Sequence, residues 1–236
     1  MRKVETLAQS RPETGAASPV VQALGLVKYY RHFPVLQGVD LEVYPGECFL
    51  LTGANGAGKT TLLRILATLL RPTRGSLRLL GQDGAVRGES LEAIRRQSFL
   101  VGHGNRLYDE LTALENLRFF AGLRDLDLSA SRASEVLEAV GLLRFGDFKV
   151  RHFSAGMKQR LVFAKVLLAS PRLLLLDEPY TALDAAGVRL VNRCVSSLVE
   201  AGGSAVMVTH NRRDAESVAR RGGVLRNGRL FPLEPQ

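Results

Sequence analysis

No apolar run in this sequence is long enough to cross a bilayer. A spanning helix needs about 20 consecutive apolar residues, but Lys165 interrupts the run LVFAKVLLA, and the leucines of RLLLLDEP end at a carboxylate. The opening residues, MRKVETLAQSRPETGAASP, also lack the apolar core of a secretory signal. We therefore expect residues 1–21 to form a disordered polar lead-in, and the chain to stay in the cytoplasm without crossing the membrane itself.

Cysteine is scarce as well. The two cysteines, Cys48 and Cys194, lie far apart in the chain and form no CxxC pair. This spacing does not suit a zinc site or a redox motif, so we expect both thiols to be reduced and packed in the core. The sequence also shows no internal repeat and no low-complexity tract.

Basic residues are in excess but are not gathered into an arm or a stripe. The chain has 32 Lys and Arg against 23 Asp and Glu, a net charge of +9, and its densest clusters are arginine pairs such as Arg95–Arg96. A dedicated nucleic-acid surface is therefore not expected. The alternative is a solvated basic surface that contacts nucleotide phosphates or an anionic inner leaflet, which also suits a peripheral membrane protein.

The order of apolar segments predicts an α/β fold. Short apolar strands alternate with helical patterns, the arrangement of a parallel sheet covered by helices on both faces. Strands followed by helices are expected at 48–53 with 60–70, 172–179 with 187–202, and 204–210 with 212–221; further strands are expected at 22–30, 35–44 and 75–81.

Two features complete the predicted organisation. Helical patterns fill the middle of the chain, so we expect an inserted helical lobe at about 91–164 between core segments 22–90 and 165–236. The final hairpin, VLRNGRLF, turns on Asn227 and Gly228, a pair typical of a type I′ turn.

The stretch GANGAGKT matches G-x-x-x-x-G-K-[ST] between an expected strand and an expected helix. Glycines allow close approach of the backbone to phosphates, and free N–H groups at a helix start supply positive charge. This pattern is typical of P-loop NTPases, with Lys59 on the β and γ phosphates of ATP and the Thr60 hydroxyl on Mg²⁺. The predicted nucleotide contacts are Gly53, Asn55, Gly56, Ala57, Gly58, Lys59, Thr60 and Thr61.

Two further strands deliver polar residues to the same edge of the sheet. Asp177 and Glu178 end the apolar run LLLLDEP, at the strand end where ligands bind in open α/β sheets. Asp177 is expected to hold Mg²⁺ through water, and Glu178 to orient or deprotonate the attacking water. His210 ends the strand SAVMVTH and is a candidate to bond the γ-phosphate and Glu178, although a structural role is open to it. The predicted catalytic residues are Glu178, His210 and Lys59.

The segment HFSAGMKQRLVFAKVLL, between the P-loop and LLLLDEPYTALD, resembles the signature helix of ATP-binding cassette (ABC) proteins, and residues 24–231 follow that family's motif order. The resemblance implies an ABC-type nucleotide-binding domain over 22–236, with a RecA-like core, an antiparallel β subdomain and an inserted helical subdomain. It also implies a head-to-tail dimer in which Ser154 and Gly156 of one copy bind the γ-phosphate held by the other. Ser154 begins a helix, which suits an anion, although a plain helix cap is the alternative.

The same resemblance assigns four more positions. Tyr30 matches the aromatic that stacks on adenine, with ordinary packing as the alternative, and Asp184 matches an acid that acts across the dimer. Ala155 departs from the family pattern, since glycine is usual there. His103 stands where the family has glutamine, and imidazole nitrogen is a poor ligand for Mg²⁺. We therefore expect His103 to bond water or a membrane partner rather than the metal.

The segments GHGNRLYDELTALENLRFF, FSAGMKQRL and DEPYTALD together resemble those of the ATP-binding subunits of cytochrome c maturation haem exporters. This resemblance implies an ATP-hydrolysing subunit that uses ATP and Mg²⁺, pairs with a second copy, and sits on the cytoplasmic face of the inner membrane against a CcmB-like permease. The segment 103–117 is the expected coupling surface, with ordinary packing as the alternative, and an apolar groove is expected on the helical lobe. A general multidrug-type exporter is the alternative function.

Two other classes fit less well. A soluble cassette ATPase that acts on DNA or the ribosome would carry tandem cassettes, a long coiled coil or a basic arm, and no long heptad run is present. A P-loop kinase or GTPase would give FSAGMKQR and His210 no functional role, and the sequence has no NKxD motif for guanine recognition.

Overall fold

The computed structural model describes residues 18–84, 89–102 and 107–233, and a six-stranded sheet forms its centre. The strand order is β10-β9-β3-β8-β7-β6, and every neighbouring pair is parallel except the β9–β10 hairpin. The predicted parallel sheet is therefore confirmed. The strands are β3 (Cys48–Thr52), β6 (Ser98–Val101), β7 (Leu173–Asp177), β8 (Ser204–Val208), β9 (Arg221–Arg226) and β10 (Arg229–Pro232).

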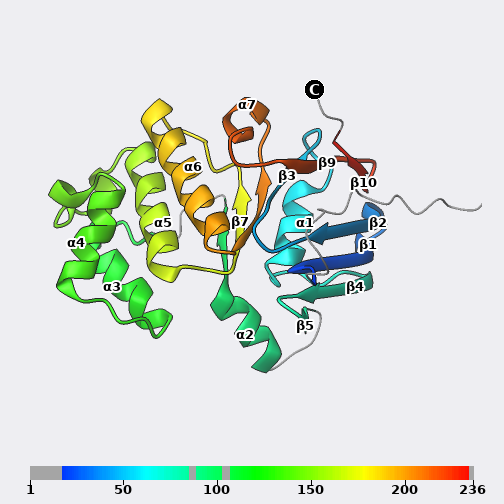
Figure 1. The fold of residues 1–236 in the computed structure, drawn as a ribbon, viewed down its shortest axis with the longest axis horizontal. Coiled ribbons are helices and arrows are strands. Elements are labelled where there is room, and N and C mark those ends of the chain that lie inside the picture. Colours follow the sequence, from blue (N-terminus) through cyan, green and yellow to red (C-terminus); the bar gives the residue numbers. More distant parts are fainter. Residues whose placement is uncertain (1–17, 85–88, 103–106, 234–236) are drawn as a thin grey trace, which may run out of the picture.

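Both faces of this sheet are buried, which explains why its strands read as continuous apolar runs. Leu174 and Leu176 of β7 belong to one core, shared with the helices α5 and α6, whereas Leu173 and Leu175 belong to another, shared with α1 and a second sheet. Figure 1 shows α5 and α6 on the opposite side of the sheet from α1. These helices are α1 (Lys59–Leu66), α5 (Ala155–Ala169) and α6 (Ala185–Glu200).

The second sheet is antiparallel, with the order β2-β1-β4-β5. Val20 and Val21 are buried in the core that it shares with α1, at 7% and 0% exposure. The predicted lead-in, 1–21, is therefore wrong at its end, because these two valines supply apolar surface to the fold; residues 1–17 lie outside the described residues. The strands are β1 (Val21–Tyr30), β2 (Phe33–Val43), β4 (Arg74–Leu79) and β5 (Gln82–Asp83).

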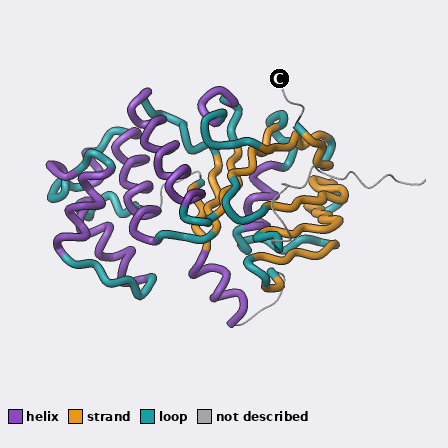
Figure 2. Tube along the Cα trace, in the orientation of Figure 1, coloured by secondary structure: helices purple, strands orange, loops and turns teal. Residues whose placement is uncertain are grey.

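The inserted helical part begins later than 91–164 predicts. α2 (Glu89–Gln97) leads directly into β6, which pairs with β7 as an edge strand of the main sheet. This pairing assigns residues 98–101 to the core, and we call residues 107–153 the helical lobe. Figure 2 shows helices gathered at one end of the molecule and the antiparallel strands at the other. The lobe contains α3 (Ala113–Leu123), α4 (Ala130–Ala139) and 3-10 turns at Leu143–Phe145 and Val150–His152.

The C-terminal part differs from the prediction in one element. α7 (Arg212–Ala215) is a single turn, whereas a helix was expected over 212–221. Residues 221–224 instead pair with β3, so the backbone groups of this stretch are satisfied in the sheet. Asn227 and Gly228 have φ of 47° and 70°, which confirms the type I′ hairpin. Within the described part of the chain, no helix combines the length and apolarity that a membrane crossing requires.

Candidate nucleotide site

The P-loop connects β3 to α1, and its backbone requires glycine at two positions. Gly53 has φ 143°, and a Cβ there would lie 2.4 Å from the carbonyl oxygen of Leu225. Gly58 has φ 104°, and its Cβ would lie 3.0 Å from a methyl group of Leu36. Gly56 also has a positive φ, 76°, but faces open space. The loop is thus fixed between β9 on one side and β2 on the other.

The start of α1 leaves its N–H groups open. Gly58 is the N-cap, so no side chain accepts from the first turn, and that turn contains no acidic residue. Such a helix end carries partial positive charge. The Lys59 ammonium folds back and donates to the carbonyl oxygens of Gly53 and Ala54, at 2.8 and 3.0 Å. Backbone donors and one ammonium group therefore converge on the loop, as an anion site requires.

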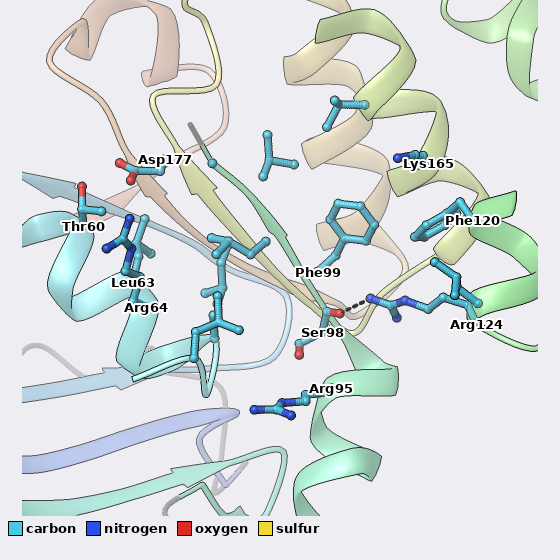
Figure 3. A pocket seen from close by; sticks show the side chains of 18 of the residues that line it. Thr60, Leu63, Arg64, Arg95, Ser98, Phe99, Phe120, Arg124, Lys165 and Asp177 are labelled. Atoms are coloured by element: carbon cyan, nitrogen blue, oxygen red, sulfur yellow. Dashed lines mark hydrogen bonds between the residues drawn. The ribbon is translucent and has the colours of Figure 1, made fainter. Parts of the chain in front are cut away.

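The carboxylate of Asp177 lies where β7 ends and is 7% exposed. It lines the same cavity as Thr60, from the first turn of α1. Figure 3 shows both residues at one end of that cavity. A hydroxyl and a buried carboxylate on one cavity offer the oxygen ligands that Mg²⁺ prefers. Thr60 and Asp177 thus line the same cavity.

Glu178 and His210 are in direct contact. His210 Nδ1 lies 2.9 Å from Glu178 Oε2, and the backbone N–H of His210 donates to the same oxygen at 3.3 Å. The Glu178 side chain is 16% exposed, whereas that of His210 is 80% exposed. Glu178 has φ 53°, and its N–H donates to the carbonyl of Val208 at the end of β8. The predicted contact between these two residues is confirmed.

Ser154 and Gly156 lie in a different hollow. Ser154 is the N-cap of α5, and its Oγ accepts from the backbone N–H of Met157 at 3.2 Å. A Cβ at Gly156 would lie 3.1 Å from the carbonyl oxygen of Ala182, so a side chain there would crowd the turn after β7. Ala155 lines the same hollow.

Asp184 borders this second hollow as the N-cap of α6. Its Oδ1 accepts from the backbone N–H of Gly187 at 2.7 Å and lies 3.0 Å from the Arg160 guanidinium. The Gly187 hydrogen bond, aided by Arg160, lowers the pKa of the Asp184 carboxyl. No P-loop residue is among the described residues that line this hollow. One chain therefore keeps its two sets of predicted nucleotide contacts apart.

Two predicted residues stand outside both groups. Tyr30 ends β1, is 44% exposed, and has the Lys28 ammonium 5.6 Å from its ring centroid. An exposed ring is free to stack, and Tyr30 is not among the described residues that line either hollow. His103 lies outside the described residues.

A family model described as "ABC transporter" matches residues 36–181, more than half of the chain. The chain belongs to the ABC transporter family. Over 207 residues the cassette is 40% identical to the cytochrome c biogenesis ATP-binding export protein CcmA of Xanthomonas axonopodis pv. citri. That match covers 87% of the cassette and 93% of the relative.

Two further comparisons widen this view. The macrolide export ATP-binding/permease protein MacB of Azoarcus sp. is 32% identical over 247 residues. That match covers 99% of the cassette but only 37% of MacB. The dimeric post-hydrolysis structure of the ATP-binding cassette MJ0796, bound to ADP and Pi, superposes with a TM-score of 0.81 at 28% identity, covering 92% of the cassette and all of that chain. The predicted fold class is confirmed, and the protein is an ABC-type ATPase.

A groove extends from the nucleotide edge of the cassette to its helical lobe. The cavity measures about 470 Å³. At its lobe end, Arg124 donates to the carbonyl of Ser98 at 2.8 Å and lies over the rings of Phe99 and Phe120 (Figure 3). We call it the interlobe groove; Tyr108, Phe119 and Leu123, which also line it, are 50%, 42% and 69% exposed.

Sequence reasoning missed two buried polar residues beside the site. Gln159 of α5 donates to the carbonyl of Pro179 at 3.0 Å and so connects the signature helix to the turn after β7. Tyr180, in that turn, is 8% exposed and bonds Asn192 of α6. Neither has a distinctive signal in the sequence, since Gln159 stands between Lys158 and Arg160 and Tyr180 follows Asp-Glu-Pro at the end of β7.

Proposed function

We propose that this cassette is the ATP-hydrolysing subunit of a haem-export transporter for cytochrome c biogenesis, on the cytoplasmic face of the inner membrane. The cargo rests on the match to CcmA, which extends over nearly the full length of both chains. The proposal that ATP joins two copies rests on geometry, since Ser154, Gly156 and Asp184 line a hollow that includes no P-loop residue. Thr60 and Asp177 line a different cavity.

ATP binding is assigned to the P-loop and β1. The open N–H groups at the start of α1, with Lys59, would hold the β and γ phosphates, and the exposed ring of Tyr30 would stack on adenine. The other loop contacts proposed are Gly53, Asn55, Gly56, Ala57, Gly58 and Thr61. Mg²⁺ fits the Thr60 hydroxyl and, through water, the Asp177 carboxylate, where the ion would neutralise phosphate charge.

Hydrolysis is assigned to the contact pair of Glu178 and His210. Glu178 is the stronger candidate for general base, because its carboxylate is mostly shielded and can accept a proton from water that attacks the γ-phosphorus. His210, bonded to the same carboxylate, would keep it aimed at the water and donate to the γ-phosphate. Charge on the transferred phosphoryl group would be met by Lys59 and by the backbone donors of the loop.

The second hollow supplies the partner's half of the site. Ser154, Gly156 and Asp184 would face the γ-phosphate held by the other copy in a head-to-tail dimer. Dimerisation itself is supported by the dimeric MJ0796 cassette bound to ADP and Pi. ATP would close the dimer, and release of phosphate would open it, which gives the motion that a membrane partner needs.

The interlobe groove is the proposed seat of that membrane partner, a CcmB-like permease. It joins the nucleotide edge to the lobe and exposes Tyr108 and Phe119, whose rings meet edge to face with centroids 4.7 Å apart. Exposed aromatic groups in a groove are typical of protein docking sites. Of the predicted coupling segment, Tyr108 lines this groove, whereas 103–106 lie outside the described residues.

A general multidrug-type exporter is the second candidate. It is favoured by the similarity to MacB, which covers 99% of the cassette. The cassette nevertheless spans a minor part of that protein, whereas it spans 93% of its CcmA relative.

Gene deletion with complementation tests the function. We expect membranes of the deletion strain to lose haem-stained c-type cytochromes, and the wild-type gene, but not Glu178→Gln, to restore them. Unchanged cytochromes after deletion would refute the role in cytochrome c biogenesis and favour the multidrug alternative. Restoration by Glu178→Gln would instead show that ATP hydrolysis is dispensable.

A further inference from the structure

The turn after β7 contacts the loop after β8 at two separate points. The first is the contact of Glu178 with His210. The second lies two residues further on, where the Tyr180 hydroxyl and the side chain of Asn192 meet the carbonyl of Asp214 in α7. At the first contact the His210 side chain is 80% exposed, and the pair belongs to the proposed catalytic site. At the second contact Tyr180 is 8% exposed.

Asn192 is the bridge at the second point. The Tyr180 hydroxyl lies 2.7 Å from Asn192 Oδ1, and Asn192 Nδ2 donates to Asp214 O at 2.7 Å and to Ser217 Oγ at 3.0 Å. A tyrosine hydroxyl has one proton to donate, and the shortest of its contacts is to this amide oxygen. Burial raises the pKa of Tyr180, which keeps that proton in place. The hydroxyl thereby holds the amide oxygen of Asn192 and leaves the amide nitrogen pointing at α7.

α7 needs such an anchor. It is one turn long, too short to be stable on its own. His210 stands two residues before it, and its imidazole contacts Glu178 but is 80% exposed, so packing around the ring does little to fix its position. Asn211, between them, bonds the side chain of Asp214, so a shift of α7 is passed directly to the residue beside the imidazole.

We propose that Tyr180 and Asn192 are positioning residues that hold His210 against Glu178 through α7. This inference rests on the proposed role of His210 in hydrolysis. Tyr180 does not touch the nucleotide cavity; it acts by fixing the Asn192 amide, which fixes the Asp214 carbonyl and hence the loop that carries His210. Small displacements of a catalytic group reduce the rate with little change in substrate binding.

The test compares two near-isosteric variants, Tyr180→Phe and Asn192→Asp, in the full chain. Tyr180→Phe removes the donor to Asn192, and Asn192→Asp removes the donor to Asp214 while keeping an acceptor for Tyr180. Tyr44→Phe is the matched control, since its hydroxyl donates to Glu42 at 2.7 Å, in a different part of the fold. The readouts are kcat and KM for MgATP, the melting temperature, and amide hydrogen exchange over 209–217.

We expect Tyr180→Phe to lower kcat about fivefold, and Asn192→Asp about tenfold, with KM changed less than about twofold, since about 1 kcal/mol of barrier is at stake. Exchange over 209–217 should rise while that of β3 stays unchanged. The double variant should lose little more than Asn192→Asp alone, because both changes break one path.

Other outcomes separate the two levels of inference. A kcat for Tyr180→Phe equal to that of Tyr44→Phe would overturn the positioning role, as would a fall in kcat accompanied by general unfolding or an equal rise in KM. In a His210→Ala background, Tyr180→Phe should have no further effect; an undiminished effect there would also overturn it. Full activity of His210→Ala by itself would refute the proposed role of His210 instead.

Discussion

Two helices of this cassette present their N-termini to a predicted phosphate, and they begin in different ways. α1 starts at Gly58, which has no side chain to satisfy the first turn. α5 starts at Ser154, whose hydroxyl already accepts from Met157. The first helix keeps all its free N–H groups for a ligand, whereas the second has committed one of them to its own cap.

This difference implies that the two helix ends contribute unequally to phosphate binding. The α1 end, with Lys59 and a glycine loop wrapped against Leu225 and Leu36, can hold an anion without help. The α5 end offers fewer free donors, and the Arg160 guanidinium in the same hollow is already paired with the Asp184 carboxylate. We infer that the P-loop binds nucleotide in a single copy, and that the Ser154 surface adds to it only when two copies meet.

The largest effect is expected at the P-loop end. Lys59→Ala should lower ATP hydrolysis by at least about 100-fold and weaken ATP binding to the single copy, because a charge-assisted contact to the β and γ phosphates is lost. Steady-state turnover and a fluorescent ATP analogue measure the two quantities. Lys149→Ala, which removes an exposed lysine of the helical lobe, is the control. ATP affinity equal to that of wild type would contradict the leading role of α1.

Glu178→Gln should separate binding from chemistry. The amide keeps the shape of the side chain but cannot accept the proton of water, so hydrolysis should fall about 100-fold or more while MgATP still binds. The variant should elute as a dimer with ATP and as a monomer without it. Glu200→Gln, at the end of α6, serves as control. A Glu178→Gln protein that stays monomeric with ATP would count heavily against a site shared between copies.

Ser154→Ala should have a smaller and more selective effect. Hydrolysis should fall about tenfold, the loss of about 1.4 kcal/mol from the transition state, while ATP binding to the single copy is unchanged. The chain offers a matched control in Ser129→Ala. Ser129 caps α4 with a bond of the same length, 3.2 Å, to Arg132, so both variants should lose similar stability, about 1 kcal/mol. Equal turnover in the two variants would reduce Ser154 to a plain helix cap.

The smallest effect concerns the two thiols, one in the strand before the P-loop and one in the helix that Asp184 caps. Burial raises the pKa of Cys48, in β3 before the P-loop, from 9.0 to about 12, and that of Cys194, in α6, from 9.0 to about 11. Because the folded pKa is raised, the unfolded chain loses its thiol proton at a lower pH than the folded protein does. The contribution of the protonated thiol to the free energy of unfolding is therefore complete below pH 9 and is lost as pH rises through the folded pKa. Urea midpoints between pH 8 and 10.5 should fall less steeply in Cys48→Ala than in wild type.

The thiol measurement has its own check. Neither cysteine should react with an alkylating reagent at pH 8 in the native state, with or without MgATP, because both are buried. Rapid labelling of Cys48 would show that β3 opens locally and that the P-loop is less firmly held than its glycine contacts suggest.

Local patterns predicted much of the fold and site. Strand ends placed Glu178 and His210 at one edge, and the structure brings them within 2.9 Å. The type I′ hairpin followed from Asn227 and Gly228, since few residue pairs tolerate two positive φ values. The helix expected over 212–221 was wrong beyond Ala215, and at its last residue Arg221 belongs instead to β9, which pairs with β3. The edge strand β6 was missed because its partner β7 lies far along the chain.

The sequence by itself determined the candidate phosphate loop, the candidate metal-binding and catalytic carboxylates, and the position of Ser154 at a helix start, because each depends on residue type and short-range backbone geometry. Only the tertiary structure decided that Thr60 and Ser154 line separate hollows and that Gln159 and Tyr180 bond the turn after β7 to α5 and α6. It also decided that a groove with exposed aromatic rings lies beside the lobe. Those features depend on contacts between segments that are distant in the chain, and residue order alone does not specify which side chains such packing brings together.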